Sequence, residues 1–287
     1  MPALRDAVVV VTGAASGIGR AVAEGCLARG ARVHLVDLEP GALGRTVEEL
    51  RARGLAPAGS HALDCRDGAA LQALAARLEG AHGRVDGLVN NAGAMLAGPV
   101  ERLPLEDWRW LVDTNLWTVL HGVRAFLPGM LARGRGRIVN TASMAGLVGF
   151  PLFSPYSATK FAVVGLSQSL DAELAPRGVR VSAVCPGFVR TGAFQAARFR
   201  LPAAWLAAIG FGFQHLSAEP GQVAEAILGR LEGEGGGVVS LPRETWPMHA
   251  VRRLSPALYA RLYGALLGPL SRAAAARAQA GAGGGRR

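Results

Sequence analysis

The sequence predicts an α/β protein in which one parallel β-sheet is covered by helices on both faces. A β-branched apolar run at 7–12 ends in a glycine-rich turn, a helical pattern follows at 17–29, and a second strand-like run occupies 32–37. The same alternation continues along most of the chain, and the strand-like runs are apolar on both faces. Such strands are typical of a buried parallel sheet, whose right-handed crossovers place helices on both sides.

The later elements are expected from the periodicity of the apolar residues. Short runs rich in Val, Ile and Leu predict strands, and longer segments with apolar residues three and four apart predict helices. In chain order we expect a helix at 41–53, a strand at 56–63, a helix at 69–82, a strand at 87–90, a long helix at 105–131, a strand at 137–141, a helix at 156–175, a strand at 179–185, a helix at 220–231 and a strand at 238–241.

Charge and cysteine content narrow the classes of function. The net charge is +10, but the arginines are scattered over many helices and cluster only near the C-terminus. Solvated helix faces account for that pattern, so no nucleic-acid partner is expected. Cys26, Cys65 and Cys185 lack metal-ligand spacing, so we expect free thiols and no metal site. Without a long apolar run or a signal peptide, we expect a cytoplasmic protein.

A glycine-rich turn joins the first strand to the first helix. It reads Thr12-Gly13-Ala14-Ala15-Ser16-Gly17-Ile18-Gly19. Small residues let the backbone turn sharply, and they let amide groups approach a pyrophosphate at the positive end of the helix. The turn therefore favours dinucleotide binding over the alternative, a merely tight connection between strand and helix.

A carboxylate at the end of the second strand indicates which dinucleotide binds. Asp37 lies about twenty residues after the turn, where it can accept hydrogen bonds from the adenosine ribose and would repel a 2′-phosphate. Neither Ser16 nor Leu38 supplies the cation that a 2′-phosphate requires. NAD is therefore expected rather than NADP, with a helix N-cap or a surface carboxylate as the alternative role of Asp37.

Tyr156 and Lys160 are the candidate acid/base pair. They are four residues apart near the start of a predicted helix, so both side chains project from one face. Lys160 is the only lysine in a chain that otherwise uses arginine, which suggests a need for a compact amine. A nearby ammonium favours the tyrosinate, so Tyr156 can act as a general base or acid. Ser143 and Asn115 are the further candidates, although each residue alone also fits an ordinary structural role.

Taken together, these motifs resemble the short-chain dehydrogenase/reductase family over residues 7–241. The matching parts are the glycine turn, the segment Asn90-Asn91-Ala92-Gly93, and Ser143 followed by the Tyr156-x-x-x-Lys160 pattern. The resemblance implies a three-layer Rossmann fold, a doubly wound parallel sheet of about seven strands in the order 3-2-1-4-5-6-7.

The resemblance also implies roles for individual residues. Asn115 is expected to hold a water in a proton relay, Ser143 to position the substrate oxygen, and Tyr156 to transfer the proton. Lys160 is expected to bind the nicotinamide ribose as well, and Asp64 to contact the adenine. The full set of expected cofactor residues is Gly13, Ser16, Gly17, Ile18, Gly19, Asp37, Asp64, Asn90, Ala92, Gly93, Tyr156, Lys160, Pro186, Gly187, Val189 and Thr191.

Two units are expected along the chain. Residues 1–245 are predicted to form one Rossmann-type catalytic domain that includes an aromatic-rich substrate lobe at 192–216. Residues 246–287 are predicted to form a helical extension with a disordered end rich in Ala, Gly and Arg. Leucines from Leu254 to Leu270 form an apolar stripe at helical spacing. We expect the stripe to pack on its own subunit, with a membrane surface or a neighbouring active site as alternatives.

The combined interpretation is an NAD(H)-dependent oxidoreductase that interconverts a hydrophobic secondary alcohol and its ketone, with Tyr156 as acid/base. An NADPH-dependent ketone or 3-oxoacyl reductase is the alternative within the same class. A catalytically silent nucleotide sensor or nucleic-acid-binding protein is the alternative from a different class. The family resemblance further implies a homotetramer or homodimer through the helices that carry Asn115 and Tyr156.

Overall fold

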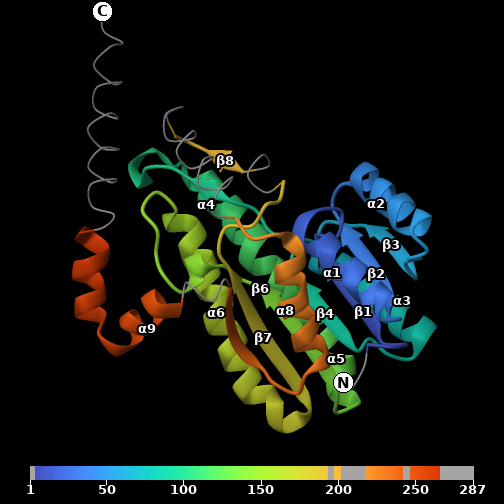
Figure 1. The fold of residues 1–287 in the computed structure, drawn as a ribbon. Helices are drawn as coiled ribbons and strands as arrows, with labels where there is room; N and C mark the ends of the chain where they lie inside the picture. The colour runs from blue at the N-terminus through green and yellow to red at the C-terminus, as the bar shows by residue number, and fades with distance from the viewer. Residues whose placement is uncertain (1–3, 193–196, 202–216, 242–245, 266–287) are drawn as a thin grey trace, which may run out of the picture.

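Seven parallel strands form the central sheet of the protein (Figure 1). The structure is a computed structural model that describes residues 4–192, 197–201, 217–241 and 246–265. In their order across the sheet, the strands are β3 (Gly59–Ala62), β2 (Arg32–Asp37), β1 (Val8–Thr12), β4 (Gly87–Asn90), β6 (Gly136–Thr141), β7 (Val179–Pro186) and β9 (Gly237–Leu241). Counted along the chain, this is the predicted order 3-2-1-4-5-6-7, so the doubly wound fold is confirmed.

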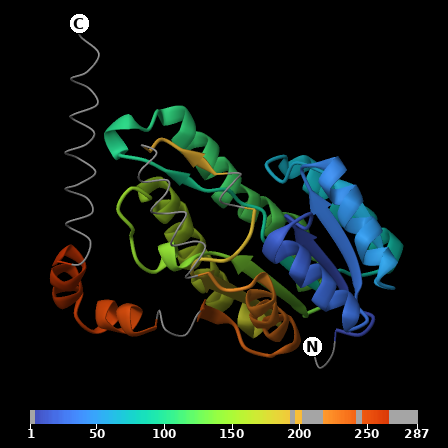
Figure 2. The same ribbon diagram turned by 45° about the horizontal axis from the view of Figure 1, so that its top comes forward.

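Helices cover both faces of this sheet (Figure 2). The helices packed on one face are α1 (Gly17–Ala28), α2 (Pro40–Ala52) and α8 (Pro220–Glu232). Those packed on the other face are α3 (Gly68–His82), α5 (Thr118–Ala132) and α6 (Ser154–Leu174). The described residues also include three 3-10 turns, η1 (Val100–Arg102), η3 (Met144–Gly146) and η4 (Ala175–Arg177).

The central strand β1 shows why the sheet is buried on both sides. Val9 and Val11 belong to the apolar core beneath α1, whereas Val8 and Val10 belong to the core beneath α3. Successive side chains of a strand point to opposite faces, so a strand covered on both faces must be apolar throughout.

The long helix expected at 105–131 is divided into three parts. α4 (Leu105–Val112) leads into a π-helical turn, η2 (Asp113–Trp117), after which α5 continues. A π turn inserts an extra residue into a helix and is frequent at functional sites. Here the π turn carries Asn115, one of the predicted catalytic residues.

A second, two-stranded sheet lies beside the main one. β5 (Leu96–Ala97) pairs in parallel with β8 (Arg198–Phe199). This pairing joins the segment after β4 to the beginning of the expected substrate lobe at 192–216. The rest of that lobe, 193–196 and 202–216, lies outside the described residues.

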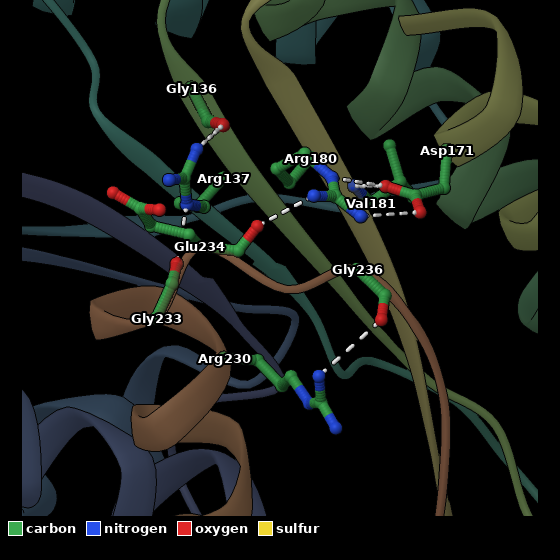
Figure 3. Close-up of polar contacts among 9 residues, drawn as sticks. All are labelled: Gly136, Arg137, Asp171, Arg180, Val181, Arg230, Gly233, Glu234 and Gly236. Atoms are coloured by element: carbon green, nitrogen blue, oxygen red, sulfur yellow. Dashed lines mark hydrogen bonds and ion pairs between the residues drawn. The ribbon is translucent and has the colours of Figure 1, made fainter. Parts of the chain in front are cut away.

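Two arginines bind loop carbonyls at the N-terminal ends of β6 and β7 (Figure 3). Arg180 forms two bonds to the carboxylate of Asp171, at 2.9 and 3.0 Å, and donates to the Glu234 carbonyl at 2.6 Å. Arg137 donates to the Gly233 carbonyl at 2.9 Å. These contacts hold the loop between α8 and β9 against the N-terminal ends of β6 and β7, at the sheet end opposite the predicted site.

The C-terminal extension begins with α9 (Trp246–Leu254) and continues as a helical segment at 256–265, which lies further from the central sheet than α9 (Figures 1 and 2). Tyr259 and Tyr263 make its apolar contacts with the core. The predicted packing of the leucine stripe is therefore wrong in detail, because Leu254, Leu258 and Leu262 are exposed. The rest of the stripe and the Ala/Gly/Arg-rich end lie outside the described residues. In the described part of the chain, no helix has the length and apolarity that crossing a bilayer requires.

A chain of three histidines links β2, β3 and α3. His34 is 4% exposed and lies 3.1 Å from the His61 ring nitrogen on one side and 2.9 Å from that of His82 on the other. Arg77 lies 3.2 Å from the second nitrogen of His61. Arginine only donates, so Arg77 donates to His61. In their neutral forms, His61 can then donate to His34, and His34 to His82. Burial, followed by the charges of His61, His82 and Arg77, lowers the pKa of His34 from 6.5 to about 4.

This histidine chain predicts a loss of stability in acid. The unfolded chain takes up a proton near pH 6.5 and the folded protein only near pH 4, so stability present above pH 6.5 is lost as the pH falls through that range. We expect the free energy of unfolding in urea to fall by about 2 kcal/mol between neutral pH and pH 4.5. His34→Gln should flatten this dependence, and the control His121→Gln should preserve it. An equal pH dependence in both variants would contradict the assignment.

Candidate active site

The glycine turn between β1 and α1 lines a cavity with backbone that large side chains do not cover. Gly13 and Gly17 have φ angles of 64° and 53°, which favour glycine. A Cβ atom on Gly19 would lie 2.1 Å from the Gly13 carbonyl oxygen, so no larger residue fits there. The side chain of Asn91 donates to the carbonyls of Thr12 and Gly13, at 3.2 and 3.3 Å. The turn is thus held in a shape that suits a pyrophosphate at the helix N-terminus.

Asp37 lies beside this turn, at the end of β2. One carboxylate oxygen accepts from the Ala15 amide at 2.9 Å, and the other accepts from the Glu39 amide at 3.2 Å. The next residue, Leu38, is 54% exposed. These contacts place a carboxylate next to the glycine turn, where an adenosine ribose would lie in a dinucleotide bound to it.

Two other expected cofactor residues have additional partners. Asp64 is paired with Arg66, whose guanidinium donates to both carboxylate oxygens, at 3.0 and 2.6 Å. The side chain of Asn90 is buried and donates to Asn140 at 2.9 Å, beneath α5 and away from the cavity. Any contact of Asn90 with a nucleotide therefore has to come from its main chain, whereas Asn91 lines the cavity.

Lys160 is buried at the centre of the site. Its side chain projects from α6, the residue is only 5% exposed, and its ammonium Nζ donates to the Thr141 carbonyl at the end of β6, at 3.0 Å. The Nζ atom lies 5.8 Å from the centre of the Tyr156 ring. Burial lowers the pKa of Lys160 from 10.5 to about 8. The amine therefore stays charged at neutral pH and carries its charge close to the phenol.

Tyr156 and Ser143 meet beside this ammonium. Burial raises the pKa of Tyr156, and a hydrogen bond with the Ser143 side chain opposes that rise. Ser143 ends the segment after β6, and its hydroxyl also accepts from the Ala145 amide at 3.1 Å. Burial thus favours the protonated phenol, which is the form that a general acid requires.

Asn115 joins the π turn to the segment after β4. Its side chain accepts from the Ala94 amide at 2.8 Å and donates to the Ala94 carbonyl at 3.0 Å. It also donates to the Thr159 hydroxyl at 3.1 Å, one residue before Lys160. A Cβ atom on Gly93 would lie 3.1 Å from the Asn115 side-chain oxygen and 3.5 Å from the Lys160 Nζ. The four expected catalytic residues therefore share one region.

A cavity of about 330 Å³ connects the glycine turn to this region. It lies at the C-terminal ends of the strands, where parallel sheets commonly bind ligands. Its largest apolar lining side chains are those of Met95, Met144, Phe150, Phe153 and Phe188. The remaining lining residues are Gly13, Ser16, Gly17, Ile18, Asn91, Gly93, Ala94, Thr141, Ala142, Ser143, Ala145, Tyr156, Lys160, Pro186, Gly187, Val189, Thr191 and Gly192.

Sequence patterns miss several residues that hold the site together. Thr12 accepts from the amides of Asn91 and Ala92, at 2.9 and 3.0 Å, and thereby ties β1 to the chain after β4. Thr159 and the Thr141 carbonyl hold Asn115 and Lys160. Only the position of Thr12 at the end of a strand signals such a role, because the other contacts depend on how the elements pack.

A buried carboxylate holds the start of the substrate lobe. Asp107 on α4 accepts from Arg198 and Arg200, each at 3.0 Å, and its side chain is 4% exposed. Hydrogen bonds from Arg200 and Arg198 lower the pKa of Asp107 despite its desolvation. The Arg198 guanidinium also lies 3.7 Å from the centre of the Trp110 ring. Together with the pairing of β5 and β8, these contacts link the lobe to the helix that continues into η2.

Comparisons with known sequences agree with this geometry. A family model described as short chain dehydrogenase matches residues 7–200. A Streptomyces virginiae protein named "Monensin polyketide synthase putative ketoacyl reductase" is 45% identical over 200 residues, which cover 69% of this chain and 76% of the relative.

Solved structures extend the similarity to the fold. A short chain dehydrogenase/reductase from Burkholderia phymatum in complex with NAD has a TM-score of 0.79 and 34% identity, over 90% of this chain and 96% of the other. A variant of the actinorhodin polyketide ketoreductase with NADPH has a TM-score of 0.72 and 31% identity, over 84% and 97% of the two chains.

Fold and site together define a nicotinamide-dependent α/β oxidoreductase that acts on CH–OH or keto groups. The chain belongs to the short-chain dehydrogenase/reductase family, as its motifs predicted.

The contacts of Asp107 predict an effect on substrate binding that is separate from chemistry. Asp107→Asn removes the charge that holds Arg198 and Arg200, so the substrate KM should rise about tenfold, equivalent to about 1.4 kcal/mol, while kcat changes by less than about threefold. Steady-state kinetics test this, with Glu106→Gln as the control because that neighbouring carboxylate is exposed. An unchanged KM, or a fall confined to kcat, would contradict the role.

Proposed function

We propose that this protein reduces the keto group of a hydrophobic substrate of the 3-oxoacyl kind to a secondary alcohol, with NADH as the hydride donor. The observation that carries the proposal is that Tyr156, Ser143 and the buried Lys160 line the same cavity, with the Lys160 Nζ 5.8 Å from the centre of the Tyr156 ring. In reduction Tyr156 acts as a general acid, and in the reverse oxidation the same residue acts as a general base.

Four residues of the site have separate roles in binding the carbonyl oxygen and transferring the proton. Ser143 and Tyr156 bind the carbonyl oxygen, and Tyr156 donates its proton as negative charge develops there. Lys160 stabilises the resulting tyrosinate electrostatically. The bound nicotinamide supplies the hydride to the carbonyl carbon, so ketone, NADH and one proton give alcohol and NAD. Asn115 holds the segment after β4 in place and, as the family resemblance implies, a water that returns the proton to Tyr156.

The lining of the cavity and the similarity to a ketoacyl reductase support the substrate class. Two methionines and three phenylalanines line the cavity, which suits an acyl or polyketide-like chain. The sequence by itself favoured an alcohol dehydrogenase and kept the 3-oxoacyl reductase as its alternative. The similarity to the Streptomyces virginiae relative favours that alternative for the direction of the reaction.

Asp37 supports NADH over NADPH. Its carboxylate lies beside the glycine turn and would repel a 2′-phosphate on the same ribose. Both dinucleotides occur among similar structures, since the Burkholderia phymatum protein binds NAD and the actinorhodin ketoreductase binds NADPH. The choice for this chain therefore rests on its own residue 37.

Assembly into a homodimer or homotetramer remains part of the proposal. Leu105 and Trp117, on the helix that carries Asn115, are 64% and 45% exposed. Large apolar side chains on an open helix face are typical of contact surfaces between subunits.

The proton-transfer role of Tyr156 predicts a selective loss of turnover. Tyr156→Phe should lower kcat for the reduction of a 3-oxoacyl thioester by about 10²- to 10⁴-fold, while the dissociation constant for NADH changes little. Tyr259→Phe is the control, because that tyrosine lies in the C-terminal extension. Absorbance of NADH reports the rate and its fluorescence reports binding. If Tyr156→Phe turned over as fast as the wild type, the proposal would be refuted. If the unmodified protein bound NADH but showed no turnover, the silent sensor would be supported instead.

Asp37 predicts the nucleotide preference. Replacing it by alanine removes the repulsion of a 2′-phosphate, so the ratio of kcat/KM for NADPH to that for NADH should rise by about tenfold or more. Glu39→Gln serves as the control, since this neighbouring carboxylate is exposed. A ratio that stays the same in Asp37→Ala would show that another residue sets the preference.

A further inference from the structure

Three leucines are exposed at the C-terminal end of the described chain. Leu254, Leu258 and Leu262 are 86%, 49% and 55% exposed, and we call them the leucine face. Leu258 and Leu262 lie four residues apart in the helical segment 256–265, so they project from the same side of it. Leu254 ends the preceding helix, α9.

Other described residues of this extension contact the catalytic domain. Tyr259 and Tyr263 pack against the core, and the Tyr263 hydroxyl donates to the Gly149 carbonyl. Arg252 donates to the Leu147 carbonyl and stacks 4.6 Å from the centre of the Phe161 ring. The tyrosine side therefore docks the extension, and the leucine face is left exposed. Exposed apolar area costs roughly 25 cal/mol per Å², so such a face on a fixed helix indicates a partner.

The charge around the leucine face indicates which partner it suits. Residues 246–287 contain seven arginines and no acidic residue, so this end of the chain carries most of the net charge of +10. Arg253 and Arg261 are exposed, next to the leucines in sequence. Apolar residues bordered by arginines match the surface of a bilayer that contains anionic lipids. A second copy of the same face would be repelled by its own charge, and nucleic acid offers no apolar partner to leucines.

We propose that the leucine face binds peripherally to the surface of a membrane rich in anionic lipids. The three leucines enter the boundary between headgroups and acyl chains, while Arg253 and Arg261 contact the lipid phosphates.

The same extension is connected to the wall of the cavity. Phe150 lines the cavity, and its ring lies 6.4 Å from that of Tyr263, next to the bonded carbonyl of Gly149. The extension that carries the leucine face therefore also contacts the cavity wall at Phe150, so a membrane bound by the leucines would lie near that side of the cavity. If the proposed function holds, a hydrophobic ketone dissolved in the bilayer would be a suitable substrate for the docked enzyme.

Sedimentation of the full chain with lipid vesicles tests the proposal. The wild type should pellet with phosphatidylglycerol vesicles at low salt, much less at high salt, and only weakly with pure phosphatidylcholine. The double variant Leu258→Glu and Leu262→Glu should lose at least about tenfold in its partition coefficient. Val100→Glu is the matched control, because Val100 is a comparably exposed apolar residue on η1, and it should bind like the wild type.

A second variant tests the charge separately. Arg253→Gln with Arg261→Gln should weaken binding to phosphatidylglycerol by about fivefold for each arginine and leave the weak binding to phosphatidylcholine unchanged. Because both arginines are exposed, this variant keeps the test valid even if the glutamate variant is less stable by thermal melting.

Three results would overturn the proposal: no binding of the wild type to phosphatidylglycerol at low salt, equal binding of the wild type and the glutamate variant, or a smaller assembly of that variant in light scattering. The last result would assign the leucine face to a second copy of the chain. Turnover is measured without vesicles, so a protein that reduces ketones but does not bind lipid refutes only the membrane proposal.

Discussion

The site depends on the burial of one ammonium group between a strand end and a helix. Lys160 is almost fully buried, and its ammonium donates one hydrogen bond, to the carbonyl of Thr141. A buried charge is costly unless it is compensated, which is why its pKa falls to about 8. The close approach of α6 to η3 holds this arrangement, since a Cβ atom on Gly146 would lie 2.5 Å from the Lys160 carbonyl oxygen. Tyr156, one helical turn earlier, is thereby fixed next to the charge.

The two ends of the sheet carry different kinds of interaction. At the C-terminal ends of the strands, the bonds of Thr12, Asn91 and Asn115 leave backbone and side chains facing a cavity. At the opposite end, Arg137 and Arg180 bind loop carbonyls (Figure 3). The contacts at one end thus hold the loop before β9, and those at the other end shape the cavity. This separation lets the substrate lobe and the C-terminal extension differ without disturbing the proton-transfer residues.

Much of the fold could be predicted because its signals are local. The continuous apolar run from Val8 to Val11 follows from burial on both faces, and the glycines after it follow from a sharp backbone turn. The π turn around Asn115 could not be predicted, because apolar periodicity continues on both sides of it. The pairing of β5 with β8 was equally hidden, since two residues give no period and their partner is a hundred residues away.

The residues of the site were more predictable than their partners. Tyr156, Lys160 and Ser143 follow from spacing and from the family resemblance, but the Asp107 contacts with Arg198 and Arg200 depend on the path of the lobe over α4. The exposed leucines show the same limit. Helical spacing identified the stripe, yet it could not tell which of two adjacent faces docks, and Tyr259 and Tyr263 occupy that side.

The central claim is that the charge of Lys160 controls the proton of Tyr156, and the pH dependence of ketone reduction measures it most directly. The wild-type kcat should be constant near neutral pH and fall as Lys160 loses its proton, with a midpoint near pH 8. The Lys160→Met variant should reduce the ketone slowly, and its kcat should show no midpoint near pH 8. A wild-type rate that is independent of pH across this range, or the same midpoint in Lys160→Met, would contradict the claim.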